Sequence, residues 1–145
     1  MIIGIVGSEA AKFTAETEKK AKMIIRDLLT KQGVVTGMSS GHCHLGGVDI
    51  WAEEIANELG LKTFIYPPKE HNWINGYRPR NLLIASTSGV VICITVKQLP
   101  PGYVGMRFGS CYHCQKHPQG CKQQHVKSGG CWTALRCKER MWFVI

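Results

Sequence analysis

Five short apolar runs alternate with longer segments in which apolar residues recur at every third or fourth position. Continuous apolar runs are typical of strands covered on both faces, and the longer period is typical of helices. The runs predict strands at residues 2–7, 34–36, 61–66, 90–96 and 141–145. The intervening segments predict helices at residues 13–32, 48–59, 80–88 and 129–140. This alternation favours an α/β, Rossmann-like fold with a doubly wound, five-stranded parallel sheet.

Turn and capping residues predict where these elements end. Thr14 or Thr17 is expected to cap the first helix, and Gly33 to follow its last turn. The polar and aromatic residues 69–79 are expected to form a loop. No repeat or low-complexity tail interrupts the pattern, so residues 1–145 are expected to form a single domain.

Small residues follow three of the predicted strands, at residues 7–8, 37–47 and 128–130. The carboxyl ends of parallel strands meet at one edge of a sheet, and ligands bind there. Glycine lets the backbone approach a ligand closely, and free N–H groups at a helix start attract anions, most often phosphate. The three loops together therefore predict an anion site. For each loop taken singly, a glycine-rich turn without a ligand is the alternative.

Composition and charge narrow the class of protein. A hydrophobic fraction of 44% is ordinary for a soluble globular chain, and no apolar run approaches the roughly 20 residues that span a membrane. The first residues lack the basic start of a signal peptide, so a cytoplasmic protein is expected. The formal net charge of +8 favours anionic partners such as nucleotides or nucleic acid.

The seven cysteines are an odd number, which argues against a disulfide framework in a reducing compartment. Three of them and a histidine form the pattern C-x2-C-x6-C-x3-H, made by Cys111, Cys114, Cys121 and His125. Thiolates and imidazoles at such spacings are typical of a tetrahedral, structural Zn²⁺ site. His117 competes with His125 as the fourth ligand, and a loop with free thiols is the alternative. The predicted zinc-binding insert, residues 102–127, separates the fourth strand from the last helix.

Four motifs resemble, in the same order, those of the SLOG superfamily. They are GIVGS at 4–8, VVTG with GGVD and alanine at 34–52, RNLLIA at 80–85 followed by VVICI, and SGGCWTA at 128–134. The resemblance is closest to the branch related to the YspA and YpsA proteins. The superfamily also includes Lonely-Guy phosphoribohydrolases and DNA-processing protein A. The resemblance implies a Rossmann-like protein that binds a nucleotide or nucleotide-derived ligand, commonly as a homo-oligomer.

The loops and the resemblance together give twelve candidate ligand-binding residues. They are Gly7, Ser8, Gly37, Gly46, Gly47, Asp49, Arg80, Asn81, Ser128, Gly129, Gly130 and Thr133. The resemblance implies that the last four hold a phosphate. It also implies that Asp49 meets a ribose or orders its loop, whereas helix position alone makes Asp49 a partner of the helix dipole.

Two residues depart from the phosphoribohydrolase pattern PGG-x-GT-x-x-E. Arg136 stands where that pattern has its catalytic glutamate, and a guanidinium cannot take up a proton. Cleavage of an N-glycosidic bond by that mechanism is therefore not expected. Trp132 replaces a small residue and either crowds the phosphate loop or stacks on a base.

Further candidates lie in the polar loops. His42 and His44 are candidates for metal binding, proton transfer or hydrogen bonds to phosphate, and Trp73 and Tyr77 for base stacking. The sequence therefore predicts a nucleotide-binding protein that senses its ligand or hydrolyses a nucleotide or nucleoside phosphate. The alternatives are a single-stranded nucleic-acid-binding module that uses the basic surface and the zinc insert, and a purely structural role.

Overall fold

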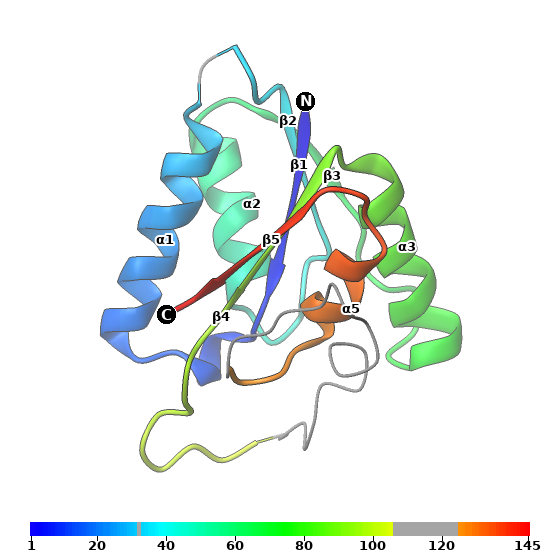
Figure 1. Cartoon of the computed structure of the whole chain (residues 1–145). Coiled ribbons are helices and arrows are strands. Elements are labelled where there is room, and N and C mark those ends of the chain that lie inside the picture. The colour runs from blue at the N-terminus through cyan, green and yellow to red at the C-terminus, as the bar shows by residue number, and fades with distance from the viewer. Residues whose placement is uncertain (32, 106–124) are drawn as a thin grey trace.

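The computed structural model describes residues 1–31, 33–105 and 125–145 and shows an α/β protein with one parallel sheet. The described strands are β1 (Ile2–Gly7), β2 (Gly37–Ser40), β3 (Lys62–Ile65), β4 (Val90–Thr95) and β5 (Arg140–Val144). They lie in the order β3-β2-β1-β4-β5, and every neighbouring pair is parallel (Figure 1). The expected five-stranded parallel sheet is confirmed, and its strand order is compatible with a Rossmann-like fold.

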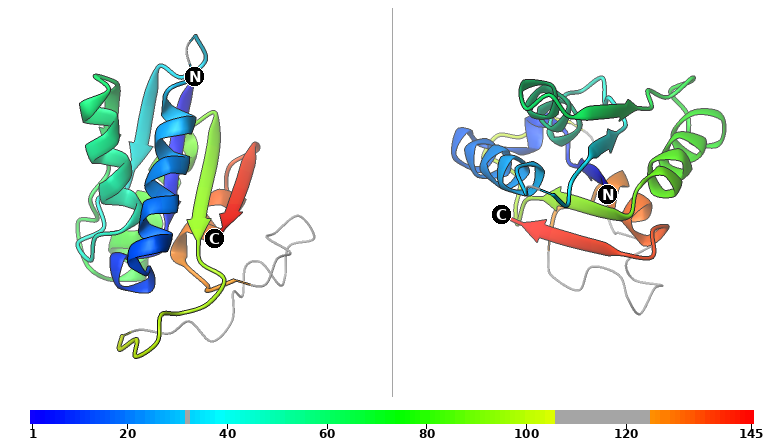
Figure 2. Two further views of the ribbon diagram at one scale, coloured as in Figure 1. Left: turned by 90° about the vertical axis from the view of Figure 1, so that its left-hand side faces the viewer. Right: turned by 90° about the horizontal axis from the view of Figure 1, so that it is seen from above.

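Helices cover both faces of the sheet. They are α1 (Ala15–Leu29), α2 (Val48–Glu58), α3 (Arg78–Thr87) and α5 (Gly129–Leu135), with short helical turns η1 (Ala10–Lys12) and η2 (Trp73–Tyr77). α1 and α2 pack together on one face, and α3 and α5 on the other (Figure 2). Each face has its own buried core, which explains why β1 and β4 are continuously apolar. No helix in the described ranges is both long enough and apolar enough to cross a membrane.

The start of α1 follows from its local sequence. Thr14 Oγ1 accepts a hydrogen bond from the Thr17 N–H at 3.1 Å, and Thr17 Oγ1 accepts one from the Thr14 N–H at 2.8 Å. This capping box pairs two backbone donors, so Thr14 is confirmed as the cap. The expectation for Gly33 is wrong, because the helix ends at Leu29 with Thr30 as its C-cap.

The second strand lies further along the chain than the apolar run predicts. β2 begins at Gly37, where the predicted strand was expected to end. Two of its buried residues, Ser39 and Ser40, are serines with hydrogen-bond partners in the core. Ser39 Oγ lies 2.6 Å from Ser88 Oγ, and Ser40 Oγ donates to the Ile5 carbonyl at 3.0 Å. Because these hydrogen bonds satisfy the buried hydroxyls, a polar segment serves as a central strand, and the predicted boundaries are wrong.

Two other predicted boundaries are also wrong. Part of the expected loop forms the π-helical turn η2, which begins where Asn72 Oδ1 accepts the Asn75 N–H at 2.8 Å. The last helix stops at Leu135 instead of continuing to residue 140. It stops there because the chain turns into the sheet, where the Glu139 carbonyl accepts the Val91 N–H of β4 at 3.0 Å.

Candidate functional site

The winding of the sheet reverses between β1 and β4, and a cavity lies beyond the carboxyl ends of the strands, at the lower end of the sheet in Figure 1. Loops diverge at such a switch point and leave space for a ligand. The cavity has a volume of about 310 Å³, within the range of roughly 300–1,000 Å³ typical of ligand pockets. It is lined by Val6, Gly7, Ser8, Glu9, Lys12, Cys43, His44, Leu45, Asp49, Trp73, Tyr77, Arg80, Asn81, Ile84, Ser128, Gly129, Gly130 and Thr133.

Nine of the twelve candidate ligand-binding residues line this one cavity. They are Gly7, Ser8, Asp49, Arg80, Asn81, Ser128, Gly129, Gly130 and Thr133. These residues come from the loop after β1, the start of α2, the start of α3 and the segment that opens α5. The structure therefore brings together loops that are far apart in the sequence, as the parallel sheet requires.

The other three candidates do not line the cavity. Gly37 begins β2 beside Ile2, at the opposite end of the sheet, because the strand starts later than predicted. Gly46 and Gly47 belong to the loop before α2, and the Val48 N–H donates to the Ser8 carbonyl at 3.2 Å. A Cβ at Gly47 would lie 2.4 Å from the Ser8 oxygen. Gly47 thus lets two cavity loops meet.

Replacing Gly47 with alanine is expected to lower the free energy of unfolding by about 3 kcal/mol, because strain and overlap add. Gly47 has a φ of 91°, and the new Cβ would overlap the Ser8 carbonyl. Gly60→Ala is the control, since its φ of 68° is also left-handed but no atom lies within 4 Å of the new Cβ. That variant should lose only about 1 kcal/mol in urea denaturation. Equal losses would show that the Ser8 contact is unimportant.

Arg80 connects the cavity loops. Its Nη1 donates to the Gly41 carbonyl at 2.5 Å, lies 3.9 Å from Asp49 Oδ2, and its guanidinium lies 5.6 Å from the centre of the Tyr77 ring. The same loop holds His42 at a left-handed φ of 50°, with Nδ1 2.6 Å from Glu53 Oε2. Strained residues of this kind persist where the surroundings fix them, often at functional sites.

Asp49 is a buried carboxyl group at the cavity wall. Burial raises its pKa from the ordinary value of 3.8 to about 6, although the Arg80 charge and a hydrogen bond from the Cys43 backbone act in the opposite direction. Burial disfavours the ionised form because the interior solvates charge poorly. Asp49 therefore exchanges its proton near neutral pH, as a general acid or base must.

Among the described residues, two buried polar atoms at the cavity have no hydrogen-bond partner. Ser8 Oγ belongs to a residue that is only 2% exposed, and Arg80 Nε is equally shielded from water. A buried donor or acceptor without a partner costs roughly 1–3 kcal/mol, so native proteins rarely keep one without a reason. Both residues line the cavity, and a ligand there offers the missing partner.

Two charged cavity residues, Glu9 and Lys12, were not among the sequence candidates. Lys12 ends η1 and is only 3% exposed, with Nζ 3.6 Å from Glu9 Oε1. The Tyr103 hydroxyl donates to the same Glu9 oxygen at 2.9 Å. Burial lowers the pKa of the Lys12 amine, while Glu9 acts in the opposite direction. In the sequence, the one feature that could have indicated Lys12 as a cavity residue was its position shortly after the Gly7-Ser8 turn.

Aromatic side chains form another part of the cavity wall. Trp73 and Tyr77, both predicted to stack on a base, line the cavity from η2. Trp132 lies behind Trp73, with ring centroids 4.9 Å apart and an edge-on arrangement. Trp132 therefore supports the cavity wall through Trp73 and is not itself among the lining residues. His44 also lines the cavity and stacks on His71 with centroids 4.4 Å apart.

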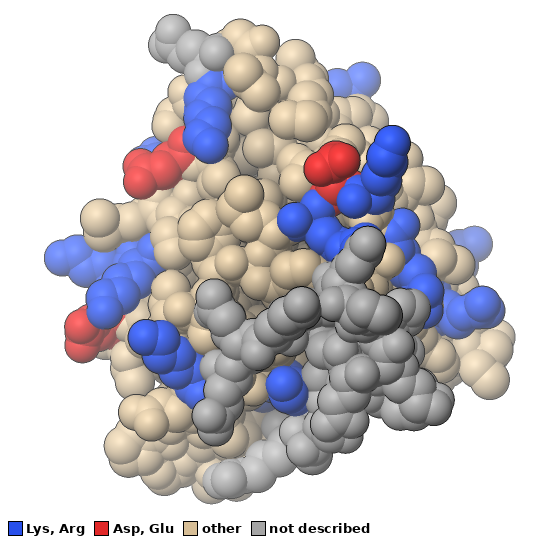
Figure 3. Space-filling model, viewed as in Figure 1, with Lys and Arg blue, Asp and Glu red and all other residues tan. Residues whose placement is uncertain are grey.

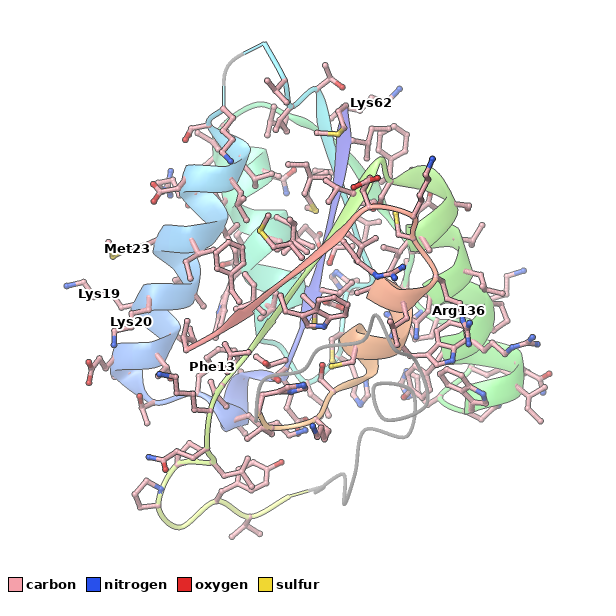
Figure 4. All side chains as sticks on the ribbon, in the orientation of Figure 1. Phe13, Lys19, Lys20, Met23, Lys62 and Arg136 are labelled. Atoms are coloured by element: carbon pink, nitrogen blue, oxygen red, sulfur yellow. The ribbon has the colours of Figure 1, made fainter. Side chains whose placement is uncertain are left out.

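Arg136 is not a cavity residue. Its guanidinium carbon lies 4.5 Å from the centre of the Trp132 ring, beside α5 (Figure 4). Cys43 does line the cavity, but burial raises the pKa of its thiol, so it stays protonated at neutral pH. Of these two buried groups, Asp49 is therefore the better candidate for proton transfer.

Most of the predicted zinc ligands lie outside the described residues. Cys111, Cys114 and Cys121, and the competing His117, fall within residues 106–124. His125 is described and buried, and its Nδ1 donates to the Val126 carbonyl at 2.9 Å. In the part of the chain that is described, no three His, Cys, Asp or Glu side chains are grouped to hold a metal. The zinc site stays a prediction.

Comparisons with models of known protein families, with curated proteins and with solved structures found no match to this chain. The likeness to the SLOG superfamily therefore rests on the four short sequence motifs. Evidence for function comes from the cavity, its shielded polar atoms and its aromatic wall.

Proposed function

We propose that this protein binds a nucleotide or nucleotide-derived ligand in the cavity beyond β1 and β4. The observation that carries the proposal is the pairing of unpartnered polar atoms, Ser8 Oγ and Arg80 Nε, with aromatic residues in one cavity. A phosphate or ribose oxygen supplies the missing hydrogen-bond partners, and a base packs against the Trp73 and Tyr77 rings. The SLOG resemblance supports the same ligand class.

The protein either senses this ligand or processes it, and we propose hydrolysis of a nucleotide or nucleoside phosphate as the reaction if it is an enzyme. Asp49 is a cavity residue suited to proton transfer, because its pKa of about 6 lies near neutral pH, and His44 is the other candidate that lines the cavity. Arg136 stacks on Trp132 and supplies no carboxylate, so the glutamate-dependent phosphoribohydrolase mechanism is not part of the proposal.

Thermal denaturation with a panel of nucleosides, nucleotides and cyclic nucleotides tests the proposal. A ligand at 100 times its dissociation constant stabilises the folded state by about 2.7 kcal/mol, which corresponds to a rise of several degrees in Tm. Native mass spectrometry of the purified protein should show a retained ligand of matching mass. If no compound in the panel raises Tm and no mass is retained, the proposal is wrong and a structural role is favoured.

Nucleic-acid binding is the second candidate, favoured by the net charge of +8. Lys and Arg side chains lie at several separate places on the face shown in Figure 3. Affinity for a single strand falls steeply with salt because counterions are released, whereas a mononucleotide in a cavity depends on salt much less. Titrating a single-stranded oligonucleotide and the mononucleotides at low and high salt separates the two functions.

We also propose that Cys111, Cys114, Cys121 and either His125 or His117 hold a structural zinc ion. The support is the ligand spacing and, in the described residues, the hydrogen bond from His125 Nδ1 to the Val126 carbonyl, a contact of the kind that orients a metal-binding imidazole. The same native mass spectrum reads the metal content. It also tests the homo-oligomer that the SLOG resemblance implies.

A further inference from the structure

Two cations among the described residues that line the cavity each lie near a carboxylate. Lys12 Nζ lies 3.6 Å from Glu9 Oε1, and Arg80 Nη1 lies 3.9 Å from Asp49 Oδ2. Charge-assisted hydrogen bonds between such groups measure about 2.7–2.9 Å. At these distances neither carboxylate makes a close charge-assisted hydrogen bond to its cation. Their placement at a cavity suits an anion that comes from outside.

We propose that Lys12 is a further ligand-binding residue, which contacts a phosphate group of the ligand, and that Glu9 competes with that phosphate for the Lys12 ammonium. This inference rests on the proposed function and names a contact that none of the sequence motifs contains. It gives the cavity a phosphate contact from η1, which follows β1, in addition to the arginine that comes from α3.

The position of Lys12 supports this role. η1 follows directly on the turn that carries Ser8, so the Lys12 ammonium and the unpartnered Ser8 Oγ are delivered to the cavity by one short segment. Burying an ammonium group is unfavourable, and burial lowers the pKa of this amine. A phosphate at hydrogen-bond distance would give the ammonium a close charge-assisted partner, which Glu9 is not at 3.6 Å.

The surroundings of Glu9 explain how it can release Lys12. The Tyr103 hydroxyl donates to Glu9 Oε1 at 2.9 Å, so the carboxylate keeps a hydrogen bond when the ammonium turns to the ligand. Glu9 also sits beside the cavity and repels any phosphate that enters. Removing its charge should therefore strengthen the binding of phosphate-bearing ligands.

Isothermal titration with matched probes tests the inference. The probes are inorganic phosphate, the four nucleoside 5′-monophosphates and the four unphosphorylated nucleosides. Lys12→Met should weaken the affinity for the monophosphate that binds by roughly 10- to 100-fold, which is the value of a charge-assisted hydrogen bond. The affinity for the corresponding nucleoside should stay unchanged. Glu9→Gln should tighten the monophosphate several-fold, and the double variant should lose this gain.

The matched control is Lys62→Met, which removes the same charge at the amino end of the sheet, where Lys62 pairs with Gly37 and is labelled at the top of Figure 4. It should bind every probe like the unmodified protein. The Glu9→Gln gain keeps the test decisive if Lys12→Met folds poorly, because misfolding cannot strengthen binding.

The outcomes separate the two proposals. If monophosphates bind and neither variant changes their affinity, the Lys12 assignment is wrong while the nucleotide function stands. If inorganic phosphate binds through Lys12 and no nucleotide or nucleoside binds, the phosphate contact is supported and the nucleotide function is wrong. If no probe binds the unmodified protein, both proposals are overturned.

Discussion

Replacing Arg80 with methionine is expected to abolish nucleotide binding and to destabilise the fold. The guanidinium donates to Gly41, lies beside Asp49 and offers an unpartnered Nε at the cavity. Loss of its hydrogen bonds to the ligand should weaken binding by roughly 100-fold or more. Loss of the buried charge beside Asp49 should lower the free energy of unfolding by about 3 kcal/mol. Titration calorimetry and urea denaturation measure the two effects separately.

Two controls show which property of Arg80 matters. Arg80→Lys keeps the positive charge but loses the planar set of donors, so it should preserve more of the stability than of the binding. Arg78→Met removes an exposed arginine from the same helix and should change neither. Binding by Arg80→Met with unchanged affinity would show that the unpartnered Nε does not face the ligand. It would also remove the main support for the nucleotide proposal.

The strand–helix alternation was enough to predict the sheet and the edge that carries the cavity. β1 and β4 are continuous apolar runs because helices cover both their faces, and this burial leaves a clear trace in the sequence. In a parallel sheet the carboxyl ends of all strands lie at one edge. At that edge meet the loops after β1 and β2 and the segment before α5. The nine candidates that line the cavity follow from that topology and from the motif resemblance.

The bounds of β2 were predicted wrongly because contacts with distant residues bury it, and the local pattern of apolar and polar residues does not show such contacts. Ser39 and Ser40 occupy core positions through hydrogen bonds to Ser88 and Ile5, which are distant in the sequence. The apolar Val34, by contrast, is exposed. The shift moved Gly37 from the expected loop to the far end of the sheet, so its ligand-binding role could not be judged from glycine spacing alone.

Glu9 and Lys12 were missed for a similar reason. A charged pair in a turn before a helix usually lies in solvent, and nothing in the local sequence indicates burial. Among the described segments, the Gly47 loop, which approaches Ser8 closely, and Tyr103, which contacts Glu9, help to enclose this turn. Lys12 is a candidate ligand contact because distant segments bury it at the cavity. Its residue type alone does not predict this.

Asp49 should make the stability of the protein depend on pH in an unusual direction. Its pKa in the folded protein is raised from 3.8 to about 6, so the folded state holds the proton more tightly than the unfolded chain does. The contribution of Asp49 to the free energy of unfolding is therefore fully present below about pH 4 and is lost as pH rises through about 6. The size of that pKa change corresponds to about 3 kcal/mol. Most native carboxylates, whose pKa values are lowered, act in the opposite direction.

Comparing the unmodified protein with Asp49→Asn isolates this effect, because all other groups titrate in both proteins. Urea denaturation at intervals from pH 4 to pH 8 should show the unmodified protein losing about 3 kcal/mol relative to the variant. Asp27→Asn, which removes an exposed carboxyl group on α1, is the matched control. A difference that stays constant or grows with pH would mean that Arg80 keeps Asp49 ionised throughout. In that case Asp49 would serve only to position Arg80, and the proposed proton transfer would need another group.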